Sequence, residues 1–255
     1  MCGVSARLMP IESASNERVK AVRRLHRIRG RRRTNQTLVE GPHLVAAALE
    51  AGTVPTEIYT VAGGALAARC EAAGSAVVEI SPAVLAAIST TVEPQDPVGV
   101  ISIPANRALT RRPTVVAVDV GDPGNFGTLI RSAGALGWQI AGLGGADPWS
   151  PKVMRASAGV QLSHPAVVLG SFNELRAAGL EPIATTVSGG IDPGSLDITR
   201  PIALLVGSES HGLPAVMVDQ CAASLTIPLA GGVESLNASV AAAVVMYALR
   251  GEENN

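Results

Sequence analysis

Three loops in this sequence combine glycines with polar or charged side chains, as a binding or catalytic site requires. They lie within residues 119–137, 203–212 and 227–249, and each follows an apolar segment. The side chains of interest are those of Asn125, Arg131, Glu209, Ser235 and Asn237. Glycine lets the backbone approach a ligand closely, and these side chains can exchange hydrogen bonds with it. Glu209 is in addition a candidate proton acceptor.

Two common site motifs do not fit these loops. The glycines at positions 121, 124 and 127 are spaced by three. This differs from the G-x-G-x-x-G fingerprint of dinucleotide-binding folds and disfavours a nicotinamide dehydrogenase. A nucleophile elbow, G-x-S-x-G, requires glycine where Ser208 stands, so a serine hydrolase is rejected. Asn237 also has a simpler interpretation, because asparagine before an apolar run commonly caps a helix.

The segments that precede the three loops predict how the loops are positioned. Residues 115–119, 202–206 and 224–228 are short and apolar, and they alternate with helical patterns. Such continuous apolar strands indicate an α/β fold with a mostly parallel sheet that is covered on both faces. Ligands bind outside the carboxyl ends of the strands in such sheets. We therefore expect the three loops to gather at one edge of one sheet.

The rest of the chain indicates further parts. Residues 34–103 contain a second alternation of strands and helices, which predicts a small α/β domain. Residues 104–113 hold prolines and arginines and are typical of a linker. A helical pattern over residues 15–28 is expected to end at Gly30. The predicted organisation is a basic arm over 1–33, the small domain, the linker, and a larger domain over 114–255.

The first 33 residues carry ten arginines and lysines against two acidic residues, although the whole chain has a net charge of −1. A basic arm on an acidic body predicts a polyanionic partner, with nucleic acid favoured over a membrane surface or a merely solvated helix face. With two Trp, two Tyr and two Phe, recognition of shape and backbone should dominate over base stacking. The candidate nucleic-acid contacts are Arg23, Arg24, Arg27, Arg31, Arg32 and Arg33.

Cysteines and hydropathy indicate the compartment. The three cysteines, at positions 2, 70 and 221, are widely spaced and form no CxxC pair, which predicts neither a disulfide framework nor a metal site. No apolar run is long enough for a membrane span, and no signal-peptide core follows Met1. These observations predict a cytoplasmic protein with no metal and no membrane partner.

The three loops together carry a family resemblance. In order along the chain, NFGTLIRSAGALG, LLVGSESHGL and IPLAGGVESLNASVA resemble the signature motifs of the SpoU (TrmH) family of the SPOUT class. Its members are S-adenosylmethionine-dependent RNA ribose 2′-O-methyltransferases. SPKVMRASAGV resembles the segment between the first two motifs, and SNERVK and LVEGPHLVAAAL resemble the family's smaller substrate-binding domain. Ser210 departs from the pattern, since glycine is more usual there.

The resemblance implies a deep trefoil knot in the larger domain, a homodimer, and S-adenosylmethionine as cofactor. By motif position it implies that Asn125, Arg131, Glu209, Ser235 and Asn237 are catalytic or substrate residues. It likewise implies that the cofactor is contacted by Gly207, Ile227, Leu229 and Leu236. Arg131 is an unusual base, because a guanidinium is almost always protonated. We expect it to bind a phosphate and to orient the ribose hydroxyl.

The implied function is methylation of a ribose 2′-hydroxyl in structured RNA. The separate small α/β domain favours 23S ribosomal RNA over transfer RNA as substrate. Two alternatives remain open, a tRNA 2′-O-methyltransferase and a non-catalytic RNA-binding or assembly protein on the same fold. Binding of S-adenosylmethionine would distinguish the last from an enzyme.

Overall fold

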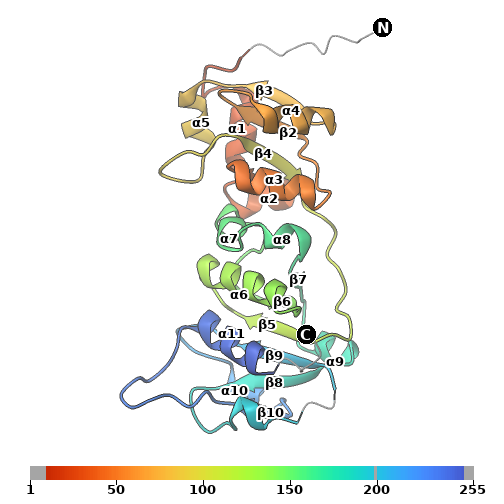
Figure 1. Cartoon of the computed structure of the whole chain (residues 1–255), viewed down its shortest axis with the longest axis vertical. Helices are drawn as coiled ribbons and strands as arrows, with labels where there is room; N and C mark the ends of the chain where they lie inside the picture. Colours follow the sequence, from red (N-terminus) through yellow and green to blue (C-terminus); the bar gives the residue numbers. More distant parts are fainter. Residues whose placement is uncertain (1–9, 198–199, 250–255) are drawn as a thin grey trace. The chain divides into compact units, whose positions relative to one another are not determined.

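The computed structural model describes residues 10–197 and 200–249 and divides the chain into two units (Figure 1). Unit 1 comprises Met1–Pro104 together with Trp149–Ser163, and unit 2 comprises Ala105–Pro148 together with His164–Asn255. Residues 1–9, part of the predicted arm, and 250–255 lie outside the described residues. No described helix is long and apolar enough to cross a membrane.

Unit 2 is built on a six-stranded sheet in which every pairing is parallel. Its strands, in spatial order, are β10 (Ala223–Leu225), β8 (Glu181–Thr185), β9 (Ile202–Val206), β5 (Thr114–Val118), β6 (Gln139–Leu143) and β7 (Val167–Val168). The central strands β5 and β9 are buried along their whole length. The predicted parallel sheet is therefore confirmed, and the carboxyl ends of its strands share one edge.

Helices cover both faces of this sheet. The longer pair, α6 (Pro123–Ala135) and α11 (Ala238–Ala248), pack against each other. The shorter helices α9 (Asn173–Ala177) and α10 (Ala215–Val218) contribute to a core cluster with Val116 and Leu205. The 3₁₀ turn η1 (Pro193–Ser195) completes the connection between β8 and β9.

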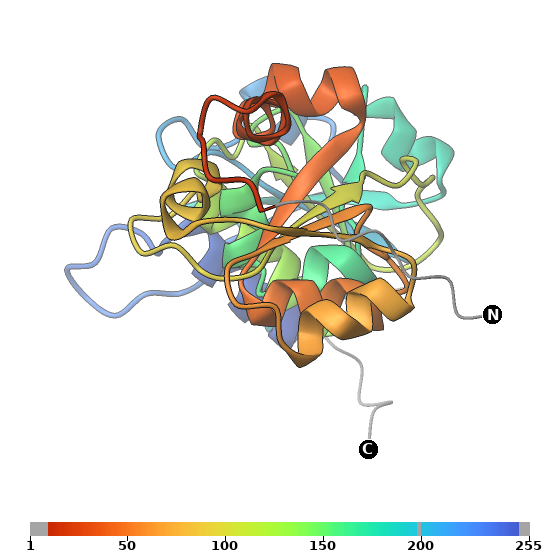
Figure 2. The same ribbon diagram turned by 90° about the horizontal axis from the view of Figure 1, so that it is seen from above.

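Unit 1 has a mixed four-stranded sheet of order β1-β4-β2-β3, in which only β2 and β3 are parallel. The strands are β1 (Gln36–Glu40), β2 (Glu57–Thr60), β3 (Ala76–Glu79) and β4 (Val98–Ser102). Its helices are α1 (Glu17–Arg24), α2 (Ile28–Thr34), α3 (Pro42–Glu50), α4 (Ala65–Ala72), α5 (Pro82–Ile88), α7 (Pro151–Ala156) and α8 (Val160–Ser163). Alternate strand residues point to opposite faces, where one core includes α1 and α5 and the other α3 and α4 (Figure 2).

The basic segment is not a separate arm over the residues that the structure describes. It folds as two helices, α1 and α2, and Val19, Val22 and Leu25 enter the core of unit 1. Gly30 lies inside α2, so the prediction of one helix ending there is wrong. A Cβ at position 30 would overlap the carbonyl oxygen of Arg24. The glycine is needed because α2 passes directly over the end of α1.

Arg31 corrects the predicted RNA surface. Its side chain is only 4% exposed, and its guanidinium donates hydrogen bonds to the carbonyl oxygens of Leu25 (2.8 Å) and His26 (3.0 Å). These carbonyls lie just past the end of α1, where helix acceptors lack intrahelical partners. Arg31 therefore fixes the turn between α1 and α2 and cannot also bind a phosphate. The other five predicted arginines are exposed.

The segment Trp149–Ser163 belongs to unit 1, although it follows β6 of unit 2 in sequence. Trp149, Met154 and Leu162 lie in the same core cluster as Val39. The Thr37 hydroxyl donates a 2.6 Å hydrogen bond to the carbonyl oxygen of Trp149. The sequence predicted one uninterrupted domain over 114–255, whereas the structure assigns residues 149–163 of that range to unit 1. Sequence order could not show that these apolar residues complete the core of the smaller unit.

Glu40, the last residue of β1, is a buried carboxylate that organises a loop of unit 1. It is 6% exposed and close to the Arg155 guanidinium (3.7 Å). Its hydrogen-bond donors are the Ser89 hydroxyl, the Thr90 N–H and hydroxyl, the Thr91 hydroxyl and the Gln95 N–H. Burial raises the pKa of Glu40, but the donors outweigh burial and the net pKa is lowered.

Candidate active site

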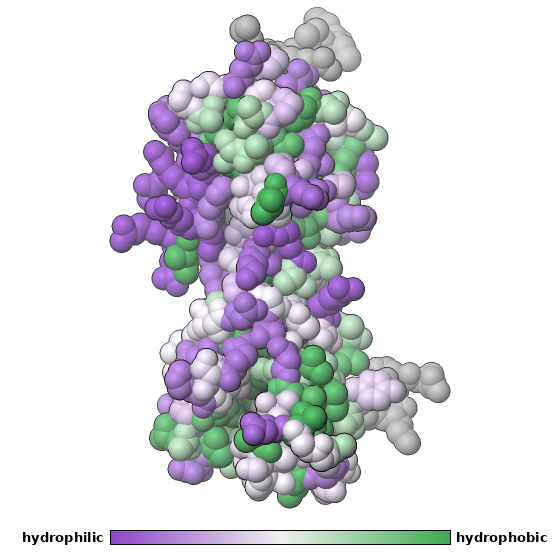
Figure 3. Space-filling model, turned by 90° about the vertical axis from the view of Figure 1, so that its left-hand side faces the viewer, coloured by the Kyte–Doolittle hydropathy of each residue, from purple (hydrophilic) through white to green (hydrophobic). Residues whose placement is uncertain are grey.

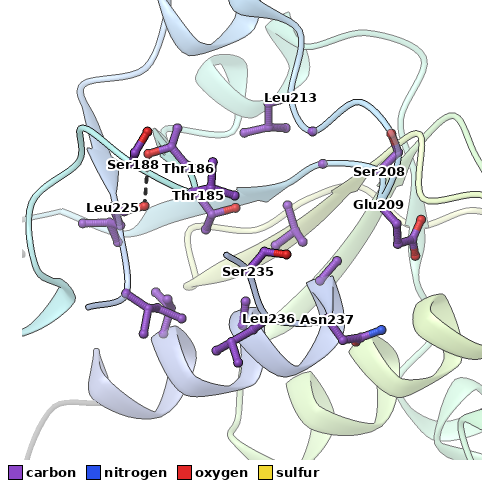
Figure 4. Close-up of a pocket in the computed structure, with 18 of the residues that line it drawn as sticks. Thr185, Thr186, Ser188, Ser208, Glu209, Leu213, Leu225, Ser235, Leu236 and Asn237 are labelled. Carbon is purple, nitrogen blue, oxygen red and sulfur yellow. Dashed lines mark hydrogen bonds between the residues drawn. The ribbon is translucent and has the colours of Figure 1, made fainter. Parts of the chain in front are cut away.

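A cavity of about 690 Å³ opens at the carboxyl ends of β8, β9 and β10 in unit 2 (Figure 4). This volume is within the usual range for small-molecule sites. Strand ends, the loops after them and the first turns of α11 form its walls. The cavity therefore lies where ligands bind in open parallel sheets.

Every residue that the family resemblance assigned to the cofactor lines this cavity. Gly207 directly follows β9, and a Cβ there would overlap the backbone of Gly212. The tight turn that follows brings the backbone of Gly207 and Ser208 to the cavity wall. Apolar wall is supplied by Ile227, Leu229 and Leu236, together with Val206 and Leu213.

Three predicted catalytic residues form a continuous hydrogen-bonded chain. Asn125, in the first turn of α6, donates from Nδ2 to Oε1 of Glu209, in the loop after β9. Asn237 donates from Nδ2 to Oδ1 of Asn125 at 3.0 Å. The three motifs thus meet at one sheet edge, which confirms the predicted gathering of the loops. Their roles in catalysis stay predictions.

Local capping positions two members of this chain. Asp122 caps α6 by accepting a 2.8 Å hydrogen bond from the Asn125 N–H. Asn237 caps α11, because its Oδ1 accepts from the N–H groups of Ser239 (3.0 Å) and Val240 (3.3 Å). The simpler interpretation of Asn237 is therefore also correct. The side-chain oxygen of Asn237 caps the helix, while the NH₂ group of the same side chain faces Asn125.

Ser239 joins the chain, although its sequence position was not singled out. Its hydroxyl lies 2.6 Å from Oδ1 of Asn237 and 3.4 Å from Oδ1 of Asn125. The only sign of it in the sequence is a lone hydroxyl residue in the otherwise apolar run over 238–246. That pattern alone equally fits a solvent-facing helix position.

Polar residues at the end of β8 were also missed. Thr185, Thr186 and Ser188 line the cavity at the opposite end from Ser208 and Glu209 (Figure 4). The hydroxyl of Thr185 donates to the carbonyl oxygen of Leu205 at 2.8 Å. The strand-end rule could have found these residues, since β8 is parallel to β9.

Ser235 and Arg131 have different positions. Ser235 lines the cavity, and within the described residues its hydroxyl has no hydrogen-bond partner. Arg131 is exposed on α6 and does not line the cavity, and it makes no hydrogen bond or ion pair with any residue the structure describes. Six residues along a helix place it about 120° around α6 from Asn125. The structure therefore does not bring Arg131 into the hydrogen-bonded chain.

Two models of known protein families match this sequence. The model of the SpoU rRNA methylase family matches residues 112–247, and the model of an MRM3-like substrate binding domain matches residues 16–99. The first match contains all three motif loops. The second includes α1, in agreement with the packing of the basic segment into unit 1.

Relatives and solved structures match nearly the whole chain. A Bacillus subtilis (strain 168) protein named 23S rRNA (guanosine(2553)-2′-O)-methyltransferase RlmP is 35% identical, covering 94% of this chain and 99% of its own length. The structure of an AdoMet-bound rRNA methyltransferase from Sinorhizobium meliloti matches with a TM-score of 0.84 at 31% identity, covering 95% and 97%. The SpoU methyltransferase AviRb from Streptomyces viridochromogenes, in complex with AdoMet, matches with a TM-score of 0.83 at 29% identity, covering 91% and 96%.

These matches define the class of the protein, which is an RNA-methylating enzyme with a separate substrate-binding domain. The chain belongs to the SpoU rRNA methylase family, because the family model spans more than half of it and a 35% identical relative matches almost end to end. The family and the enzyme class expected from the three motifs are thereby confirmed.

Proposed function

We propose that this protein transfers a methyl group from S-adenosylmethionine to a ribose 2′-hydroxyl of 23S ribosomal RNA. The names of the Bacillus subtilis relative and of a second relative, from Streptomyces viridochromogenes, support this substrate, since both are 23S rRNA 2′-O-methyltransferases. The observation that carries the proposal is the Glu209 carboxylate at the cavity, held by Asn125 beside a ligand-sized space. Mapping 2′-O-methylation of ribosomal and transfer RNA in a knockout strain tests it. Loss of a methyl group from tRNA alone would contradict it.

The residues of the cavity fit S-adenosylmethionine. Ile227, Leu229 and Leu236 offer apolar surface to a flat adenine, and the exposed backbone after β9 offers hydrogen-bonding groups. When bound, the cofactor supplies an electrophilic methyl group on a positively charged sulfur. Calorimetric titration of the purified protein with S-adenosylmethionine tests this fit. An absence of binding would favour a non-catalytic RNA-binding protein.

Glu209 is the proton acceptor in this proposal. A free ribose hydroxyl is a poor nucleophile near neutral pH and needs a base within hydrogen-bonding distance. Asn125 donates to one carboxylate oxygen of Glu209, and the exposed position of this side chain leaves the other oxygen accessible to substrate. Ser235 supplies a hydroxyl in the same cavity.

Arg131 binds an RNA phosphate and orients the hydroxyl. It is exposed and unpaired among the residues that the structure describes, and a guanidinium is suited to bidentate phosphate binding. Arg131→Ala should abolish methylation and leave S-adenosylmethionine binding unchanged by calorimetry. Arg176→Ala is a matched control in unit 2, because this guanidinium already stacks on Phe172. Loss of cofactor binding in Arg131→Ala would count against the role.

The protein acts as a homodimer in this proposal, with α11 in the interface. Val240, Val244 and Tyr247 are about half exposed and recur at helical spacing, which forms an apolar stripe on α11. Apolar patches also interrupt the visible surface of unit 2 (Figure 3). Val244→Glu should convert a dimer to a monomer in analytical ultracentrifugation. A monomeric unmodified protein would contradict the proposal. The family resemblance further supports a trefoil knot in unit 2, and the widely spaced cysteines support a cytoplasmic location.

The RNA-binding surface is the exposed cationic side of α1 and α2. Hydrophilic residues cover much of the visible face of unit 1 (Figure 3). Five arginines remain exposed after Arg31 is removed from the predicted set, namely Arg23, Arg24, Arg27, Arg32 and Arg33. Phosphate contacts by these side chains would release counterions and make binding salt-dependent.

Charge substitution, not deletion, tests this surface, because deleting residues 1–33 would also remove Val19, Val22 and Leu25 from the core. Replacing the five arginines by Gln should weaken RNA binding more at low salt and flatten the salt dependence by roughly 0.7–0.9 per lost phosphate contact. Arg69→Gln, at an exposed position on α4, is the control. An unchanged slope would contradict the assignment.

A further inference from the structure

We propose that Ser239 is a positioning residue for methyl transfer, and that its buried hydroxyl orients Asn125, adds to the hold on Asn237 and, through these two side chains, orients the carboxylate of Glu209. This inference rests on the function proposed above. Ser239 does not itself line the cavity, and it does not contact Glu209 directly. Its influence must therefore pass through the two amide side chains.

The contacts of Ser239 place it at the inner end of the chain. The residue is 3% exposed and lies in the first turn of α11. Its hydroxyl is 2.6 Å from Oδ1 of Asn237 and 3.4 Å from Oδ1 of Asn125. Its single proton is donated mainly to Oδ1 of Asn237, and Oδ1 of Asn125 is the weaker acceptor of a three-centre hydrogen bond. Burial keeps water from replacing it in either contact.

The order of donors and acceptors explains what this hydroxyl does. Oδ1 of Asn237 accepts from the Ser239 hydroxyl and from the N–H groups of Ser239 and Val240, so the NH₂ group of Asn237 turns outward to Oδ1 of Asn125. With its oxygen occupied, Asn125 presents its own NH₂ group to Glu209. If either amide flipped, like groups would face each other. A flip of Asn125 would in addition turn its oxygen toward the carboxylate of Glu209, and the two oxygens would repel each other.

Helix capping alone does not account for Ser239. The backbone N–H groups of Ser239 and Val240 already donate to Oδ1 of Asn237. These two donors would hold Asn237 whatever side chain stood at position 239. What the hydroxyl adds is the reach to Asn125, which no backbone donor of α11 shares among the described residues. The expected consequence of losing it is a poorly oriented Asn125 and Glu209, not a lost helix.

The first experiment measures steady-state kinetics of Ser239→Ala and Ser239→Cys with S-adenosylmethionine and 23S rRNA. Both variants remove a strong O–H donor, and cysteine keeps nearly the same volume. We expect kcat to fall about tenfold, as for one hydrogen bond, with both KM values within about twofold of wild type. Ser157→Ala is the matched control, because Ser157 is also buried and its hydroxyl donates, within the part of the chain that the structure describes, to the carbonyl of Met154 alone. An unchanged kcat, or a rise in KM that accounts for the loss, would overturn the inference.

The second experiment separates positioning from a merely structural role. In an Asn125→Ala background the path from Ser239 to Glu209 is interrupted, so Ser239→Ala should change the single-turnover rate by less than about twofold. A loss of equal size in both backgrounds would overturn the inference. If Ser239→Ala does not fold, Ser239→Cys takes its place in the cycle. An inactive wild-type enzyme would instead refute the proposed function. An active wild type with a slow Asn125→Ala variant and a fast Ser239→Ala variant would refute the inference alone.

Discussion

Glu40 of unit 1 and Glu209 of unit 2 are the same residue type at or just after the end of an apolar strand, yet their surroundings differ. Glu40 is buried, its two oxygens accept from several hydroxyl and N–H groups, and Arg155 lies beside it. Glu209 is exposed at the rim of the cavity and, among the described residues, accepts one side-chain hydrogen bond, from Asn125.

This difference shows how to distinguish a structural carboxylate from one that is available for catalysis. A carboxylate whose acceptor sites are all occupied holds a loop in one conformation and cannot meet a substrate. A carboxylate with one oxygen held and the other accessible can accept a proton from a bound hydroxyl. The number of protein donors around the group therefore carries more information than its place after a strand.

The largest effect is expected at Glu209. Glu209→Ala should lower kcat about 10³-fold, or roughly 4 kcal/mol, because a positioned general base contributes in this range. The thermal melting temperature should not change, since the side chain is exposed. Rapid-quench measurement of methyl transfer checks the first point, and Asp219→Ala, at an exposed position after α10, is the control. A loss of only a few-fold would remove Glu209 as the base.

The opposite outcome is expected for Glu40. Glu40→Ala should destabilise unit 1 by about 3 kcal/mol, because it leaves the Thr90 N–H and hydroxyl without their buried acceptor and removes the charge partner of Arg155. In a Trp138→Phe background, Trp149 reports on unit 1 alone, and its fluorescence follows denaturant unfolding. Binding of S-adenosylmethionine to unit 2 should persist at low denaturant. Glu71→Ala, exposed on α4, is the control, and equal stability of the two variants would contradict the structural role.

The same contrast applies to neighbouring arginines. Arg31→Ala should destabilise unit 1 by about 2 kcal/mol, because two helix-terminal carbonyls lose a charged donor. Arg32→Ala should change stability by less than about 0.5 kcal/mol, because that side chain is exposed. Denaturant unfolding measures both changes. RNA affinity at low salt should fall more in Arg32→Ala than in Arg31→Ala, when both variants are assayed under conditions in which they are folded.

The smallest effect is a pH dependence that arises from Glu40. Because its folded pKa lies below the unfolded value of 4.5, its ionised form stabilises the fold above that pH. This contribution is lost as pH falls through the lowered folded pKa. The difference in unfolding free energy between wild type and Glu40→Gln should thus be constant near neutral pH and shrink below about pH 4.5. Denaturant titrations at several acidic pH values measure it, and a constant difference would exclude this linkage.

Sequence patterns predicted the elements of unit 2, because apolar strands show as local patterns. They also predicted the meeting of its three motifs, because the carboxyl ends of parallel strands share one edge of the sheet. They could not predict Ser239 or Arg31, whose roles depend on what lies across from each side chain. Gly30 was misread as a helix stop, since a close approach between helices leaves the same residue in the sequence. Arg131 matches a motif position, yet in the structure of this polypeptide it lies outside the hydrogen-bonded residues at the cavity.

The membership of Trp149–Ser163 in unit 1 bears on how the protein can be dissected. The chain passes from one unit to the other three times, at residues 104–105, 148–149 and 163–164. A protease nick within 105–113 would therefore leave two fragments that share a folded core. A gene truncated at residue 104 would encode a unit without Trp149, Met154 and Leu162. Neither unit can therefore be exchanged as one continuous segment. Chimaeras with relatives must exchange residues 149–163 together with residues 1–104.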